Sequence, residues 1–121
     1  MPVDPTRGDL ARLLDDEDSG GPVVMLNLLK FRDGGRAVYD ENAREAQAFL
    51  GRYGAQVVYA GDCSTALVAP EQHAWDAVLL VRYPSRRMFL DMVADPEYQG
   101  ITGLRSDALC DAVLQATIPW A

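Results

Sequence analysis

The residues best suited to chemistry are polar side chains that stand among apolar ones. Tyr98 and Arg105 lie about two turns apart in a predicted helical stretch, so both can face the sheet beneath it. A phenol and a guanidinium beside an apolar cavity would hold a carboxylate or an enolate. We therefore predict Tyr98 as a catalytic residue and Arg105 as a substrate-binding residue. The alternative is that both residues cap or pack the helix.

Asn27 interrupts the apolar run VVMLNLLKF at residues 23–31. A buried amide needs hydrogen-bond partners, because leaving it unpaired costs free energy. One interpretation is that Asn27 binds substrate and orients its carbonyl or carboxylate group. The other is that the amide bonds a neighbouring side chain or bulged backbone and keeps the strand in register.

His73 is the single histidine of the chain and lies in the loop PEQHAWD. If that loop folds over the mouth of a cavity, His73 is the natural proton shuttle and the second catalytic candidate. Otherwise it is an exposed loop residue. One histidine excludes a two-histidine metal site within one chain, and the sequence lacks a glycine-rich phosphate loop, HExxH and GxSxG. We therefore predict no metal and no cofactor.

Two further substrate-binding candidates lie near the ends of the predicted strand at residues 75–83. Trp75 could stack on a ligand, although packing against the protein is the competing interpretation. Arg82 could hold a substrate carboxylate or form a salt bridge at the rim of the fold.

Apolar patterning predicts the elements that must position these residues. Residues 23–31 and 75–83 are apolar at nearly every position, which is typical of strands covered on both faces. A stripe of apolar residues predicts a helix over 38–53 that ends before Gly54. The other strands are expected at 55–60, with a bulge at Gly61 and Asp62 before residues 64–68 continue it, and at 110–118.

Two capping signals predict helices after the third strand. Ser85 follows Pro84 and precedes a run with apolar residues at helical spacing, so it should cap a helix. Asp95 followed by Pro96 repeats the signal for the last helical stretch, which carries Tyr98 and Arg105.

The order strand, helix, strand, strand, helix, strand predicts a ferredoxin-like α+β fold with a four-stranded antiparallel sheet. Met25 and Leu29 on one side of the first strand, and Leu26 and Leu28 on the other, are all apolar. A sheet with one solvated face should instead alternate. We therefore predict that the second face packs on another copy, giving a homodimeric α/β barrel. A monomer with an apolar open face is the alternative.

Charge and composition exclude several classes of protein. The 121 residues carry 18 acidic and 11 basic side chains, a net charge of −7, which disfavours a nucleic-acid partner. No apolar run approaches the roughly 18 residues of a membrane span, and no signal peptide is recognisable. We therefore expect a cytoplasmic protein. Residues 1–21 form an acidic extension with a short helix at 6–14, and residues 22–121 form a single domain.

Several segments together resemble the domain-of-unknown-function family 1330 of the dimeric α/β-barrel superfamily. They are PVVMLNLLKFR, RYGAQVVYAG and WDAVLLVRYPSRRMFLDMVADPEYQ, together with Arg105, Ala108 and Leu109. The resemblance covers residues 22–118 and implies a ferredoxin-like protomer and a dimer. The wider superfamily includes cofactor-free monooxygenases of aromatic polyketides, lactone isomerases, cyclases and haem proteins, so it implies no single activity.

Two functions remain open on this basis. The first is a cofactor-independent enzyme of oxygenase, isomerase or cyclase type that acts on a small organic acid or an aromatic, polyketide-like carbonyl compound. The second is a non-catalytic module that binds a metabolite or a partner protein. A cavity with convergent polar groups would favour the enzyme, and a filled interior would favour the module.

Overall fold

A computed structural model describes residues 4–15, 21–70 and 74–120 of the chain. Its elements follow in the order α1 (Arg7–Asp15), β1 (Val23–Phe31), α2 (Gly35–Arg52), β2 (Gln56–Asp62), β3 (Ala77–Tyr83), α3 (Arg86–Ala94), α4 (Pro96–Gln99), α5 (Thr102–Ala108) and β4 (Leu109–Thr117). The strands pair antiparallel in one sheet of order β2-β3-β1-β4. This is the predicted ferredoxin-like α+β fold.

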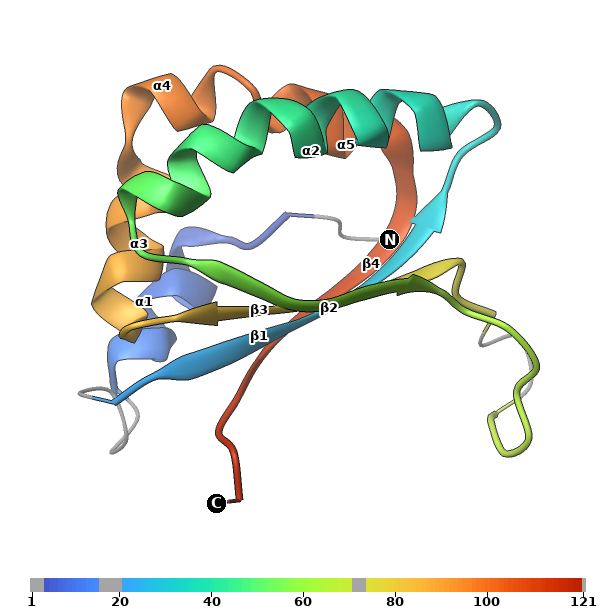
Figure 1. Ribbon diagram of the computed structural model, residues 1–121, viewed down its shortest axis with the longest axis horizontal. Helices are drawn as coiled ribbons and strands as arrows, with labels where there is room; N and C mark the ends of the chain where they lie inside the picture. Colours follow the sequence, from blue (N-terminus) through green and yellow to red (C-terminus); the bar gives the residue numbers. More distant parts are fainter. Residues whose placement is uncertain (1–3, 16–20, 71–73, 121) are drawn as a thin grey trace.

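The helices gather on one face of the sheet (Figure 1). α2 packs against α5 over that face, and α1 packs against α3 at one end of the molecule. Val23 and Met25 of β1 are buried beneath the helices, together with Phe89 and Met92 of α3. The core therefore lies between the sheet and its helical cover, and the alternate residues of each strand point away from it.

The opposite face of the sheet, here called the open face, is apolar and has no helix over it in the described part of the chain. The strand register aligns Leu26 of β1 with Leu80 of β3, and Leu28 with Val78. The resulting patch of half-buried residues comprises Val24, Leu26, Leu28, Val78, Leu80 and Val113. Both faces of the central strands are therefore apolar.

The predicted end of β2 was wrong. β2 ends at Asp62 instead of continuing through residues 64–68, where Leu67 and Val68 are 91% and 96% exposed. The register shift lies between Val57 and Tyr59 and not at Gly61. A Cβ at position 61 would lie 2.5 Å from the Tyr59 hydroxyl oxygen, so a larger residue there would displace the exposed Tyr59 side chain. The Tyr59 ring therefore crosses over Gly61.

The predicted helix ends are formed by local hydrogen bonds and by one glycine. The Ser85 hydroxyl accepts a hydrogen bond from the Met88 backbone N–H at 3.2 Å, at the start of α3. Gly54 follows α2 with φ of 69°, the left-handed conformation expected there. α2 itself begins at Gly35, earlier than the residue-38 start that its apolar stripe predicts.

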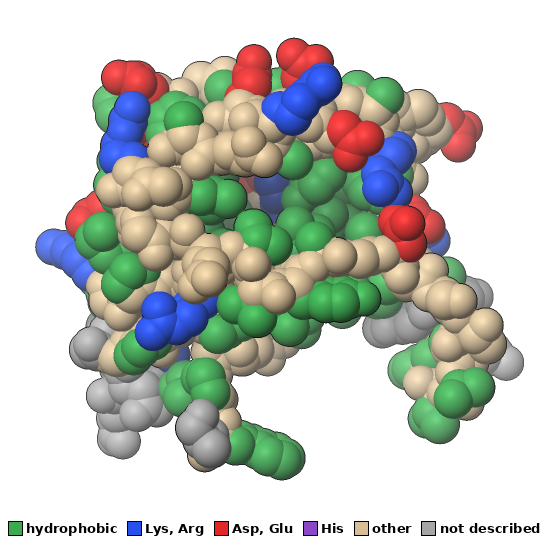
Figure 2. Space-filling view, viewed as in Figure 1, with side chains coloured by type: hydrophobic (Ala, Val, Ile, Leu, Met, Phe, Trp, Pro, Cys, Tyr) green, Lys and Arg blue, Asp and Glu red, His purple; other side chains and the backbone are tan. Residues whose placement is uncertain are grey.

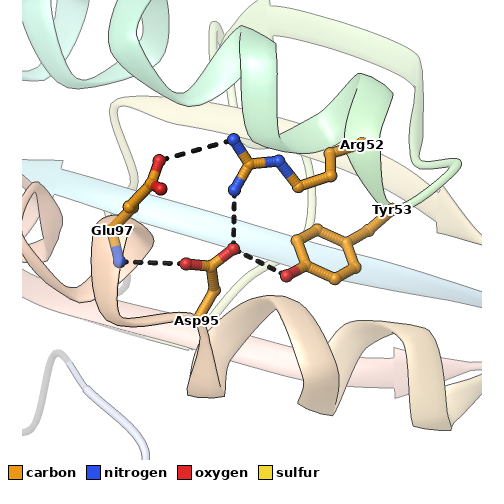
Figure 3. A network of polar contacts seen from close by, with 4 residues as sticks. All are labelled: Arg52, Tyr53, Asp95 and Glu97. Atoms are coloured by element: carbon orange, nitrogen blue, oxygen red, sulfur yellow. Dashed lines mark hydrogen bonds and ion pairs between the residues drawn. The ribbon is translucent and has the colours of Figure 1, made fainter.

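Asp95 joins the end of α2 to the start of α4 (Figure 3). Its carboxylate accepts the Glu97 backbone N–H at 2.9 Å and the Tyr53 hydroxyl at 2.6 Å. Arg52 donates to the same carboxylate at 2.8 Å and to Glu97 at 3.4 Å. The Tyr53 hydrogen bond, with help from Arg52, lowers the pKa of Asp95. This network holds α4, and with it Tyr98, against α2.

Asp95→Ala is expected to lower the melting temperature by roughly 5 °C at pH 7, because the helix cap and the contacts of α2 disappear together. Asp95→Asn should lower the melting temperature less, since an asparagine side chain also caps helices. The folded pKa lies below the ordinary 3.8, so the charge-dependent stabilisation is present above about pH 4 and disappears as the pH falls further. Thermal melting of the three proteins at pH 7 and pH 3 checks this. Equal melting temperatures at pH 7 would contradict it.

Candidate functional site

A cavity of about 320 Å³ lies between the helices and the sheet. Figure 2 shows a hollow beneath α2 whose walls are largely hydrophobic. The apolar lining includes Met25, Leu79, Val81 and Leu114 from the sheet, Ala43, Ala46 and Leu50 from α2, and Phe89, Met92 and Val93 from α3. A space of this size, apolar and with a few polar groups, is typical of a small-molecule site.

Arg105 brings a positive charge to this cavity from α5. Its side chain is 13% exposed, and its Nη1 donates to the Asp4 carboxylate at 3.1 Å. The other Asp4 oxygen accepts the Ser106 hydroxyl at 2.6 Å. Asp4 and Pro5 also line the cavity, so the N-terminal segment places a carboxylate against the guanidinium. Arg105 therefore already binds a carboxylate, but one that belongs to the chain.

Tyr98 lies in α4 and lines the same cavity. Its ring packs edge-on against Phe49 of α2, with centroids 5.5 Å apart. Burial raises the pKa of Tyr98, and the nearby Arg105 charge partly opposes this shift. The phenol therefore stays protonated near neutral pH and serves as a hydrogen-bond donor.

Asn27 lies in the middle of β1 on the side of the sheet that faces the helices, and it lines the cavity. Its register partners Leu79 and Leu114 line the cavity on either side of it. The amide nitrogen donates to the Met25 carbonyl at 3.3 Å. This bond takes one amide hydrogen, and within the described chain no donor lies in hydrogen-bond reach of the side-chain oxygen. The amide can therefore bond its own strand and a ligand at once.

Two of the predicted site residues, Arg82 and Trp75, do not line this cavity. Arg82 is exposed and pairs with Val24 in register, which places it on the open face. Trp75 is half-buried just before β3 and is not among the lining residues. His73 lies outside the described residues. The structure thus brings together Asn27, Tyr98 and Arg105.

Among the polar lining residues that sequence reasoning missed are Tyr39 and Asn42 of α2 and Tyr83 of β3. Tyr39 lies on the apolar stripe that predicts the helix over 38–53, and Tyr83 ends an apolar strand. A signal was present, because tyrosine on a buried face carries a hydroxyl that must find a partner. Burial raises the pKa values of both tyrosines, so both are neutral donors.

A second hollow, of about 550 Å³, lies between α1 and β4. Its lining includes Leu10 and Leu13 of α1 and Ala112 to Ala116 of β4. Although it is larger, it contains none of the converging residues Asn27, Tyr98 and Arg105, so the cavity beneath α2 is the candidate site. In the described ranges no cluster of three or more histidine, cysteine or acidic residues could hold a metal ion. No helix there is long and apolar enough to cross a membrane.

Comparison of structures places the chain among ferredoxin-like proteins. It resembles a protein of unknown function from Rhodopseudomonas palustris at 29% identity, covering 98% of this chain and 97% of that chain with a TM-score of 0.89. The methylated form of that protein matches at 31% identity, covering 99% and 96% with a TM-score of 0.90. The chain belongs to the same family as this Rhodopseudomonas palustris protein.

More distant structures share the fold alone. A putative antibiotic biosynthesis monooxygenase from Bacteroides thetaiotaomicron is 16% identical, with coverage of 85% of this chain and 93% of that chain and a TM-score of 0.60. A dimeric ferredoxin-like protein of unknown function from Bacteroides fragilis is 12% identical, with coverage of 80% and 95% and a TM-score of 0.55. No protein-family model matches the chain, and no curated protein does.

Proposed function

We propose that the protein is a cofactor-independent enzyme that acts on a small organic acid or an aromatic, polyketide-like carbonyl compound. The observation that supports this most is the convergence of Asn27, Tyr98 and Arg105 on one largely apolar cavity. Arg105 supplies charge for a carboxylate or enolate, Tyr98 supplies a neutral donor, and Asn27 supplies an amide. A small anion with an apolar body matches both the charge and the walls.

The polar groups can act on charge that develops in a reaction. A preorganised guanidinium and phenol stabilise an oxyanion better in a dry cavity than in water. The proton itself must move through another group, for which we propose His73, the single imidazole of the chain. The fold shared with a putative antibiotic biosynthesis monooxygenase fits this proposal.

A second candidate is a module that binds the same ligand without changing it. It is favoured by the absence of a free base among the described lining residues, where the one carboxylate, Asp4, is bonded to Arg105 and Ser106. His73→Ala separates the two candidates. An enzyme that uses His73 would lose turnover with unchanged ligand affinity, whereas a binding module has no turnover to lose.

The experiment that tests ligand binding is a thermal-shift screen of small carboxylates and aromatic carbonyl compounds. A ligand present at 100 times its dissociation constant should stabilise the fold by about 2.7 kcal/mol, which raises the melting temperature by several degrees. A crystal soaked with the best ligand should show it in contact with Arg105. No stabilisation by any acid or carbonyl compound would contradict the proposal.

We also propose that the family is the domain-of-unknown-function family 1330 and that the protein is a homodimer joined through the open face. The patch around Leu26 and Leu80 is a sheet face that water would otherwise cover. The ferredoxin-like protein from Bacteroides fragilis is itself dimeric, which supports this arrangement.

Leu26→Asp is expected to weaken the dimer on the order of 100-fold or more, because it buries an unpaired charge at the centre of the interface. Sedimentation should show wild-type particles of twice the chain mass and variant particles of the chain mass. Ala48→Glu, an equally charged change at an exposed position of α2, is the matched control and should leave the dimer intact. A monomeric wild-type protein at micromolar concentration would overturn the proposal.

A further inference from the structure

Tyr83 is the most deeply placed polar residue of the cavity. Its side chain on β3 is 4% exposed, and its ring packs edge-on against Phe89 with centroids 5.0 Å apart. Within the described part of the chain, no hydrogen-bond partner lies in reach of its hydroxyl. Because Tyr83 lines the cavity, its hydroxyl can donate a hydrogen bond to a ligand or a water molecule bound there.

Two more phenols from other elements share this space. Tyr39 comes from α2 and Tyr98 from α4, and both line the cavity with Tyr83. Neither hydroxyl has a hydrogen-bond partner among the residues described. The three lie close enough for charge on one to act on another, since an ionised Tyr98 or Tyr39 would raise the pKa of Tyr83 further. Three neutral donors from three separate elements therefore line the same cavity.

Three charged side chains act on these phenols: Arg105 on Tyr39 and Tyr98, Asp40 on Tyr39, and Asp4 on Tyr98. The Arg105 charge opposes the burial-driven rise in pKa of both Tyr39 and Tyr98, which places it near both hydroxyls. The pKa of Tyr83 is raised by burial and by the other two phenols, without an effect of Arg105. Tyr83 therefore lies further from that charge. The donors therefore extend from Arg105 into the apolar interior.

We propose that Tyr39, Tyr83 and Tyr98 form an oxyanion-binding subsite beside Arg105, so that the ligand is a carbonyl compound held as its enolate or phenolate. This rests on the proposed function, and it adds the chemical class of the ligand and two residues that bind it. Three phenolic protons cannot all be satisfied by an apolar group. They are best satisfied by ligand oxygen atoms with high negative charge, since hydrogen bonds to an ionised acceptor are stronger than neutral ones.

The cavity size suits a single-ring ligand. A volume of about 320 Å³ lies at the lower end of the range of small-molecule pockets. 4-Nitrophenol is therefore a suitable probe, because it has one ring and its ionised form is distinguished from its neutral form by colour. An oxyanion subsite binds the ionised form preferentially and so lowers the pKa of the bound probe, whereas an ordinary apolar pocket raises it.

The test is a pH titration of 4-nitrophenol absorbance with and without the purified protein. We expect the pKa of the probe to fall by about one unit on binding, equivalent to about tenfold tighter binding of the phenolate. Tyr83→Phe and Tyr39→Phe should each weaken phenolate binding by on the order of tenfold. Tyr59→Phe, at an exposed tyrosine of β2, is the matched control and should bind the probe as the wild type does.

Either of two results would overturn this subsite. One is a bound probe whose pKa rises, which would show a pocket for neutral ligands and leave the proposed cavity function standing. The other is wild-type affinity in Tyr83→Phe and Tyr39→Phe, which would show that water alone occupies these hydroxyls. If one variant fails to fold in a thermal melt, the other carries the test, because each removes a single hydroxyl from a different element. Failure of all acids and carbonyl compounds to bind would instead end the proposed function itself.

Discussion

Gly35→Ala is expected to destabilise the protein by about 3 kcal/mol, enough to lower the melting temperature by roughly 10 °C. A Cβ at this position would lie 2.1 Å from the backbone oxygen of Ala108, far inside any tolerated contact. That obstacle is backbone at the end of α5, so it cannot turn aside as a flexible side chain would. The helices α2 and α5 must therefore separate.

The contact at Gly35 belongs to a tightly bonded junction. The Arg32 backbone N–H donates to the Ala108 carbonyl at 2.9 Å, and the Arg32 side chain donates to the Leu109 carbonyl at 2.9 Å. Ala108 and Leu109 are fully buried. Because α5 also carries Arg105, a shift at this junction moves the guanidinium relative to Tyr39 of α2. Gly35→Ala should therefore weaken ligand binding as well as the fold.

Gly51→Ala is the matched control in the same helix. Nothing lies within 4 Å of a Cβ built at Gly51, which is exposed, so alanine should raise stability by about 0.5–1 kcal/mol through its better helix propensity. Urea unfolding of both variants measures the difference. If Gly35→Ala were as stable as the wild type, the close packing of α2 on α5 would be wrong.

Local signals explain why most of the fold could be predicted from sequence. Ser85 and Asp95 bond backbone groups within three residues, and Gly54 adopts its left-handed conformation at the end of one helix. Such features depend on residues that are close in the sequence, so the sequence alone predicts them. The Tyr59 ring over Gly61 depends on how a side chain lies across a strand, which is why the glycine there suggested a bulge instead.

The candidate site could be predicted only in part, for a similar reason. Asn27 and Arg105 were recognisable as polar residues in apolar surroundings. Tyr39 and Tyr83 fit the apolar pattern of their elements equally well, and only the packing of α2 over β3 shows that they share a cavity. Asp4 lies far from Arg105 in sequence, so nothing in the chain predicts their ion pair.

Arg105→Met is expected to weaken binding of benzoate, a one-ring carboxylate, by roughly 10- to 100-fold. Methionine keeps an apolar stem of similar reach but removes the charge that recognises the carboxylate. The benzoate affinity of Arg105→Lys should fall between those of the wild type and Arg105→Met, because lysine retains the charge and loses the bidentate geometry of the guanidinium. Isothermal titration calorimetry of the three proteins with benzoate gives the comparison. Equal affinities would show that the anion binds elsewhere.

Asp4→Asn is expected to strengthen benzoate binding, the opposite of the effect of Arg105→Met. The Asp4 carboxylate lies 3.1 Å from the Arg105 Nη1, so it competes with any ligand carboxylate for that guanidinium. Its neutral amide leaves Arg105 more attractive to anions, and benzoate should bind several-fold more tightly. In the Arg105→Met background the same change should have little effect, since the competition needs the charge. An Asp4→Asn effect that persists there would mean that the Asp4 charge repels the anion directly instead of competing for Arg105.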